Sequence, residues 1–76
     1  MENEGEVLQK IGRKLKELRV NAGYNSLEPF VYDHKLPRMQ YWRMEAGTAN
    51  FTMKSLLRVL EVHQLTVKEF FVLIED

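Results

Sequence analysis

The chain has 76 residues, enough for one small domain. None of them is cysteine, which excludes disulfide bridges, thiolate metal centres and cysteine nucleophiles. The absence of cysteine also fits a reducing cytoplasm. Its 45% hydrophobic and 29% charged residues exclude a disordered chain, and no stretch approaches the roughly 18 consecutive apolar residues of a membrane span. The 11 basic and 11 acidic side chains cancel, which argues against a nucleic-acid-binding protein, because such proteins ordinarily carry a basic excess.

Helical spacing begins after a flexible acidic tail at residues 1–5. The first predicted helix runs from about 6 to 22 and ends at Gly23, since glycine readily takes the left-handed conformation of a helix cap. Its apolar residues recur at steps of three and four and so share one face: Leu8, Ile11, Leu15, Leu18 and Ala22.

The second predicted helix begins near Ser26, a favourable N-cap residue, with Pro29 in its first turn. Two starts are compatible with this proline. Either Ser26 caps the N–H of Glu28, or the helix begins one turn later. The inward face carries Phe30, Val31 and His34.

Three further helices show the same periodicity. The third runs from about 37 to 46, Thr52 caps the fourth, and the capping-box spacing of Thr66 and Glu69 opens the fifth. The apolar stripe of the fourth consists of Met53, Leu56, Leu57, Leu60 and His63, and that of the fifth consists of Val67, Phe70, Phe71 and Ile74. No alternation of apolar and polar residues is long enough for a strand, so we expect a compact all-α domain of five helices over residues 6–76.

The third helix carries an unusual outer face. At about 100° per residue, Tyr41 and Met44 point toward the core and Gly47 closes the helix. The opposite face carries two arginines with a methionine and a tryptophan: Arg38, Met39, Trp42 and Arg43. A solvated helix face ordinarily carries Lys and Glu, so this composition indicates a face that contacts a partner.

Three stretches resemble, in order and spacing, the Cro/phage-repressor family of helix-turn-helix proteins, also called XRE-type regulators. They are IGRKLKELRVNAGY at 11–24, SLEPFVYDHKLPRMQYWRMEAG at 26–47 and MKSLLRVLEVHQLTVKEFF at 53–71. The resemblance implies a lambda-repressor-like domain that binds operator DNA as a homodimer and regulates transcription. It places the helix at about 37–46 in the major groove.

The resemblance also implies roles for individual residues. The base-reading positions are Arg38, Met39, Gln40, Trp42 and Arg43. Arginine reads guanine through O6 and N7, whereas the methionine and the tryptophan offer only apolar contact. Ser26 and Lys54 occupy positions that contact the DNA backbone, and Arg19 and Glu45 match a pair that bridges the first and third helices.

The chain departs from the family pattern at several of these places. Leu27 replaces a glutamine that contacts the DNA backbone, and the loop 48–52 lacks basic residues. Lys35 replaces a glycine of the turn, so this lysine must take a positive φ or reshape the turn.

Residues 10–43 nevertheless carry eight basic and three acidic side chains, so we expect modest, salt-sensitive DNA binding.

Five consecutive apolar residues at 70–74 expose more apolar surface than a monomer ordinarily tolerates. One interpretation is a terminal helix that fits a groove of its own domain. We favour a two-fold dimer, which paired DNA half-sites also require. The expected interface consists of Phe71, Val72, Leu73 and Ile74.

A second function class remains open, namely a protein-interaction module that keeps the scaffold without reading DNA. Trp42 suits such a contact, because tryptophan is favoured at protein hot spots. His34 and His63 lie on inward faces without further ligands, which favours core histidines over a metal site. We expect no enzyme activity, cofactor, metal, membrane or small-molecule substrate, since no catalytic arrangement or phosphate-binding glycine loop is present in the sequence.

Overall fold

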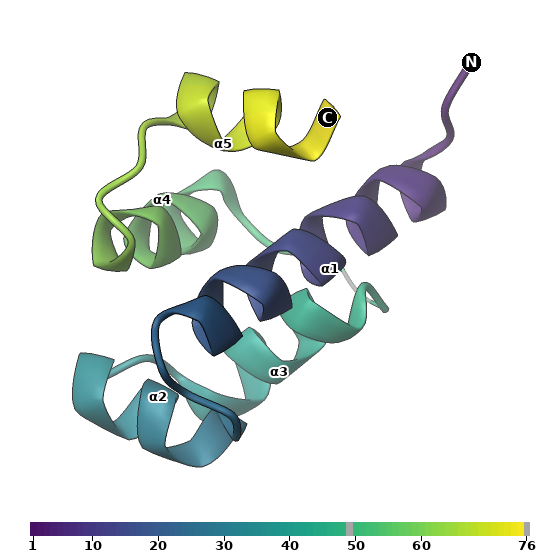
Figure 1. Cartoon of the computed structure of the whole chain (residues 1–76). Coiled ribbons are helices and arrows are strands. Elements are labelled where there is room, and N and C mark those ends of the chain that lie inside the picture. The colour runs from purple at the N-terminus through teal and green to yellow at the C-terminus, as the bar shows by residue number, and fades with distance from the viewer. Residues whose placement is uncertain (49, 76) are drawn as a thin grey trace.

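Five helices and no strands form the part of the chain that the computed structural model describes, residues 1–48 and 50–75 (Figure 1). They are α1 (Glu4–Asn21), α2 (Leu27–His34), α3 (Arg38–Ala46), α4 (Met53–Val62) and α5 (Val67–Glu75). The predicted all-α architecture of five helices is therefore confirmed. No helix in the described ranges is long and apolar enough to cross a membrane.

Helix α1 is the element around which the others are arranged. It contacts α3 and α5, while α2 contacts α3 and α4 contacts α5. Figure 1 shows α2 and α3 below α1, with α4 and α5 on the other side of it. Helices α2 and α5 therefore lie on opposite sides of α1, while α4 reaches the start of α3 through the hydrogen bond of Gln40 to Ser55.

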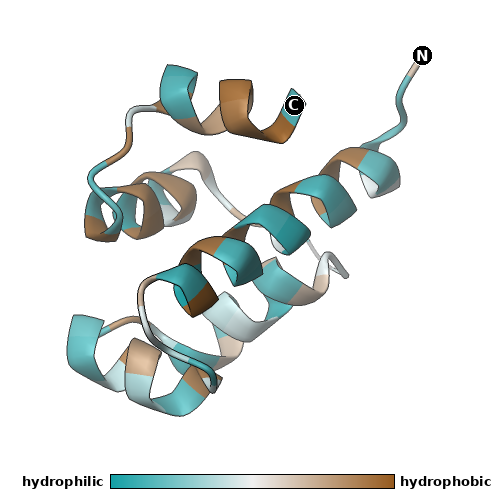
Figure 2. Ribbon diagram, viewed as in Figure 1, coloured by the Kyte–Doolittle hydropathy of each residue, from teal (hydrophilic) through white to brown (hydrophobic). Residues whose placement is uncertain are grey.

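The core draws apolar side chains from all five helices, as the helical periodicity predicts. The most buried are Leu15, Phe30, Tyr41, Leu56, Leu60 and Phe70. Figure 2 shows hydrophobic residues interspersed with hydrophilic ones along α1 and α4, the pattern of helices with one buried face. Two predicted core positions of α4 are wrong, because Met53 is 57% and Leu57 is 46% exposed. The buried stripe of α4 runs through Val59 instead.

Helix α1 begins earlier than the sequence predicts. The side chain of Asn3 accepts a hydrogen bond from the backbone N–H of Glu6 at 2.9 Å and so caps a helix that starts at Glu4. Residues 4 and 5 are therefore helical rather than part of a loose tail. Asparagine is among the strongest N-cap residues, so the signal was present in the sequence.

The predicted start of α2 near Ser26, with Pro29 in the first turn, is confirmed, whereas the predicted cap of Glu28 by Ser26 is not. The helix begins at Leu27, directly after Ser26, yet the Ser26 side chain makes no capping hydrogen bond. An N-cap serine ordinarily accepts from the N–H of the second or third helical residue, and Pro29 at the third position has none. The proline costs no helical hydrogen bond there, because the first four N–H groups of a helix lack partners in any case.

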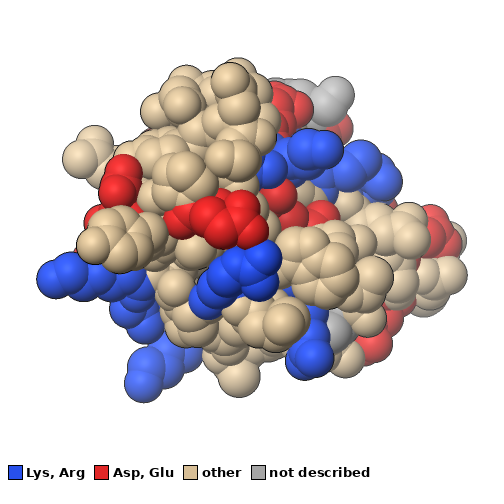
Figure 3. All heavy atoms as spheres, turned by 90° about the horizontal axis from the view of Figure 1, so that it is seen from below, with Lys and Arg blue, Asp and Glu red and all other residues tan. Residues whose placement is uncertain are grey.

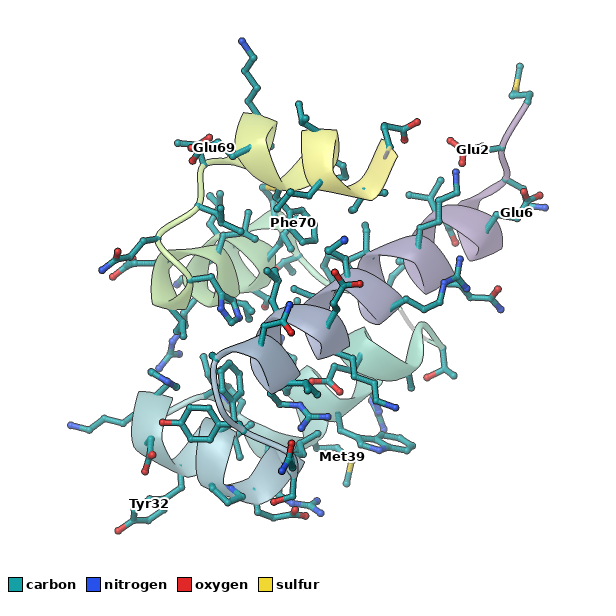
Figure 4. The ribbon with its side chains drawn as sticks, viewed as in Figure 1. Glu2, Glu6, Tyr32, Met39, Glu69 and Phe70 are labelled. Atoms are coloured by element: carbon teal, nitrogen blue, oxygen red, sulfur yellow. The ribbon has the colours of Figure 1, made fainter. Side chains whose placement is uncertain are left out.

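The local caps of α4 and α5 are confirmed. Thr52 accepts from the N–H of Ser55 at 3.1 Å. Thr66 and Glu69 form the reciprocal capping box, with hydrogen bonds of 2.8 and 3.1 Å. The hydrogen bond that the Glu69 carboxylate accepts from the backbone N–H of Thr66, together with a smaller contribution from the Thr66 hydroxyl, lowers the pKa of Glu69, whose side chain lies at the start of α5 in Figure 4.

Candidate nucleic-acid interface

The outer face of α3 is exposed as predicted. Tyr41 and Met44 are 1% and 2% exposed and belong to the core, whereas Met39 and Trp42 are 54% and 49% exposed. Arg38 and Arg43 are also exposed. Figure 4 shows Met39 extending from the lower side of the molecule, away from α1. The structure thus brings the expected partner-contacting side chains of α3 to one open surface.

The turn that joins α2 to α3 is short and strained. Lys35 adopts the left-handed conformation, with φ 55° and ψ 43°. The N–H of Leu36 donates to the carbonyl of Val31 at 2.9 Å at the end of α2, and Pro37 is the N-cap residue of α3. Of the two alternatives for Lys35, a positive φ or a reshaped turn, the structure shows the positive φ.

Arg38 is held by α2. Its Nη2 donates to Oε2 of Glu28 at 2.6 Å, and both side chains remain more than half exposed. This hydrogen bond is the main cause of the lowered pKa of the Glu28 carboxyl. Sequence reasoning missed the pair, since Glu28 lies ten residues before Arg38 and the contact depends on the turn between them. Arg38 is thus ordered at the edge of the face and partly neutralised.

Arg43 differs from Arg38, because the described residues give it no ion pair. It borders a shallow hollow with Met39, Gln40 and Phe51. Among the described residues, Arg43 is therefore the arginine of this face that has no ion pair within the protein.

Gln40 is held by α4 on the opposite flank. Its Nε2 donates to Oγ of Ser55 at 2.7 Å, and Ser55 in turn lies 3.0 Å from Oγ1 of Thr52. Gln40 thus connects α3 to the start of α4 in the free protein. The predicted contribution of Gln40 to base reading requires this amide to share or exchange its partner.

Trp42 lies on the α2 flank of the face. It borders an open hollow together with Lys16, Leu27 and Ala46. About half of the indole remains in solvent. Trp42 is thus only partly buried, and its exposed part is accessible to a partner.

The predicted bridge between α1 and α3 is present. Arg19 Nε and Nη2 donate to the two carboxylate oxygens of Glu45 at 2.7 and 3.1 Å, and Nη1 donates to the carbonyl of Tyr24 at 2.7 Å. The side chains are 5% and 8% exposed. The hydrogen bond to Glu45 raises the pKa of Arg19, and burial raises that of Tyr41 beside them.

The close approach of α1 to α3 depends on Gly12. A Cβ at this position would lie 2.3 Å from the carbonyl oxygen of Glu45 and 2.8 Å from that of Met44. Only glycine lets these two backbones approach so closely, and the approach places Arg19, about two turns further along α1, within reach of Glu45. In the sequence this glycine is marked only by the stretch 11–24 that resembles the family.

The two predicted backbone-contacting residues lie on different helices. Ser26 is exposed at the start of α2, and its hydroxyl is not used for capping. Lys54 is exposed in the first turn of α4 and borders a hollow with Arg58. Arg58 was missed, although its spacing of four residues from Lys54 places both on one helical face.

Charges of both signs cover the side of the molecule that holds this surface. Figure 3, which looks at the molecule from below Figure 1, shows Asp and Glu side chains close to Lys and Arg rather than a uniform basic patch. The surplus positive charge of residues 10–43 is therefore interrupted by nearby carboxylates, such as that of Glu28 beside Arg38. Strong sequence-independent attraction to a polyanion is not expected from such a surface.

The predicted dimer residues lie on α5, at the other end of the molecule from α2 and α3 (Figure 1). Val72 is 53% exposed, while Phe71, Leu73 and Ile74 are half-buried. Val72 and Leu73 border an open, mainly apolar hollow with Leu65. An interface through α5 would leave the outer face of α3 uncovered.

The histidines pack in the core region. The rings of His34 and His63 lie 5.0 and 5.6 Å from the ring of Phe30, between α2 and α4. Burial lowers the pKa of His63, with a smaller contribution from His34. Among residues 1–48 and 50–75, no group of three or more His, Cys, Asp or Glu side chains is placed to hold a metal ion.

Comparisons with protein-family models, with curated proteins and with solved structures gave no match to this chain.

Proposed function

We propose that the chain is a sequence-specific DNA-binding transcriptional regulator of the XRE type. It acts in the cytoplasm on operator DNA as a homodimer, with α3 in the major groove. The observation that carries the proposal is the outer face of α3, where Arg43, Met39 and Trp42 are exposed above a buried Tyr41 and Met44. The resemblance of the sequence to this family supports the same orientation of α3.

Within this proposal, Arg43 is the principal base reader. Its lack of an ion pair in the described residues leaves the guanidinium free for a bidentate contact with guanine. Met39 contributes apolar contact, to which thymine methyl groups are suited. Arg38 reads a base at the edge of the surface after exchanging Glu28 for the DNA.

Selection from random duplexes at low salt, followed by binding measurements on the selected operator, tests the proposal. Arg43→Ala is expected to weaken operator binding by about 1–3 kcal/mol and to relax preference at one base pair. Arg13→Ala is the matched control, because Arg13 is an exposed arginine on α1. Unchanged affinity and preference in Arg43→Ala would refute this assignment.

The homodimer is a separate part of the proposal. We infer a two-fold contact through the exposed part of α5, and sedimentation equilibrium tests it. Val72→Lys is expected to shift the protein toward monomer, while Val20→Lys, at an exposed valine of α1, leaves the association unchanged. A monomeric unmodified protein at tens of micromolar would contradict the dimer.

The second candidate function is a protein-interaction module. It is favoured by the half-exposed indole of Trp42 and by the mixture of charges on the same side (Figure 3). The two functions differ in their response to salt. Binding to DNA weakens steeply as salt rises, because counterions are no longer released favourably, whereas an apolar contact centred on Trp42 does not. Failure to retard any duplex would favour the interaction module.

A further inference from the structure

A hollow of about 170 Å³ lies between the start of α3 and the first turns of α4. Its polar lining comes from Gln40 on α3 and from Lys54, Ser55 and Arg58 on α4. Lys54 and Arg58 are the two charged residues of this lining, and no carboxylate belongs to it. The hollow is therefore a cationic concavity, in contrast to the nearby Arg38, whose charge is paired with Glu28.

Arg58 is fixed at the hollow by the chain on the other side. Its Nη2 donates to the carbonyl oxygen of Lys35 at 2.5 Å. Lys35 is the left-handed residue of the turn that leads into α3. A guanidinium has five N–H donors, and no second hydrogen bond of Arg58 occurs within the described ranges. The side chain is thus ordered by one donor and keeps the others for a ligand.

The opposite wall is also ordered before any ligand arrives. Gln40 donates to Ser55, and the N–H of Ser55 is held by Thr52, so the first turn of α4 and the start of α3 form one connected polar surface. A wall that is already ordered lowers the entropy lost on binding. Lys54 projects from the same turn of α4 and adds a second cation.

The family resemblance already implies a DNA-backbone contact for Lys54. We propose that Arg58 is a second ligand beside it, so that this hollow receives one phosphodiester group of the DNA backbone. This inference rests on the proposed function and adds to it. Two cations around an uncompensated concavity suit a compact anion with several oxygen acceptors, and a guanidinium binds phosphate oxygens bidentately. Arg58 then joins the phosphate to the Lys35 carbonyl and positions the start of α3 against the groove.

The salt dependence of operator binding tests the site. Each phosphate contact contributes about 0.9 to the slope of log affinity against log salt. Arg58→Ala and Lys54→Ala are each expected to weaken binding to every duplex and to lower that slope by about one contact. Arg13→Ala removes an exposed cation from α1 and should leave the slope unchanged. An unchanged slope in Arg58→Ala, or an equal loss in Arg13→Ala, would overturn the proposal.

Arg58→Lys separates the contact from the positioning role. Lysine keeps the charge, so the slope should stay close to that of the unmodified protein. It lacks the planar fork that binds the Lys35 carbonyl and a phosphate at once, so operator affinity should still fall. Unfolding by urea checks that each variant folds. A lysine variant with the affinity of the unmodified protein would overturn the positioning role.

Titration with inorganic phosphate, followed by amide NMR signals, keeps this test distinct from that of the proposed function. Shifts at Ser55 and Arg58 that vanish in Arg58→Ala support the anion site. Such shifts without retardation of any duplex would overturn the DNA assignment and leave a site for free phosphate. Duplex binding that Arg58→Ala leaves unchanged, without phosphate shifts, would overturn the site and leave the proposed function standing.

Discussion

Replacing Glu45 by glutamine should destabilise the domain by about 3–5 kcal/mol, because it leaves Arg19 as a buried charge without its counterion. The carboxylate accepts two hydrogen bonds from Arg19, of 2.7 and 3.1 Å, and the two side chains are 5% and 8% exposed. A glutamine amide retains one acceptor and turns an N–H₂ donor toward the second guanidinium N–H. The charge and one hydrogen bond are lost together.

The expected loss is large for a domain of this size. Ordinary stabilities of about 0.05–0.15 kcal/mol per residue correspond to about 4–11 kcal/mol for 76 residues. Glu45→Gln should therefore unfold at a much lower urea concentration, measured by circular dichroism at constant pH. The dependence of the free energy on urea should not change, since the surface exposed on unfolding is the same.

Two further variants make the result specific to burial. Glu17→Gln removes the acid of the Lys14–Glu17 pair, in which Glu17 is 58% exposed, and should change stability little. Arg19→Met combined with Glu45→Leu removes both charges and should be more stable than Glu45→Gln alone, because no unpaired charge remains. Equal effects of Glu45→Gln and Glu17→Gln would refute the reasoning.

Three other outcomes follow from described features. Stability should decline as pH falls below 6.5, the ordinary pKa of histidine, because burial lowers the pKa of His63 and the unfolded chain therefore binds the proton more readily. The variant His63→Gln should flatten this decline. An unchanged urea unfolding profile between pH 7 and 5 would contradict the prediction. Gly12→Ala should cost about 1–3 kcal/mol in urea unfolding, since its Cβ meets the backbone of Glu45, and unchanged stability would show that α1 and α3 separate freely. Lys35→Gly should stabilise the domain by about 0.5–1 kcal/mol by removing a positive φ from a residue with a side chain, and a loss would show that the lysine side chain matters more.

The features that sequence reasoning predicted correctly depend on local chemistry. The capping box of Thr66 and Glu69 needs only its own four residues. The left-handed Lys35 is one of the two alternatives that the glycine of the family pattern leaves at this position. The orientation of α3 follows from Tyr41 and Met44, because these two side chains share one face of the helix and that face is buried.

The features that it missed depend on contacts between distant segments. The hydrogen bond of Arg58 to the Lys35 carbonyl spans 23 residues, and the need for Gly12 appears only when the backbone of α3 lies beside it. Met53 and Leu57 were misplaced for a related reason. Periodicity identifies an apolar stripe, but the neighbouring helices decide how wide a part of it they cover.

The alternation of charges over the side that holds α3 also governs the time that the protein takes to find a partner. The fields of neighbouring opposite charges largely cancel at a distance, and salt screens the remainder beyond the Debye length of about 8 Å at physiological ionic strength. A distant duplex therefore exerts little attraction on the surface in Figure 3. Association should then proceed at the unsteered rate of about 10⁵–10⁷ M⁻¹s⁻¹. Such a protein would discriminate among sites by residence time, leaving incorrect sequences quickly and remaining only where the side chains of α3 find matching bases.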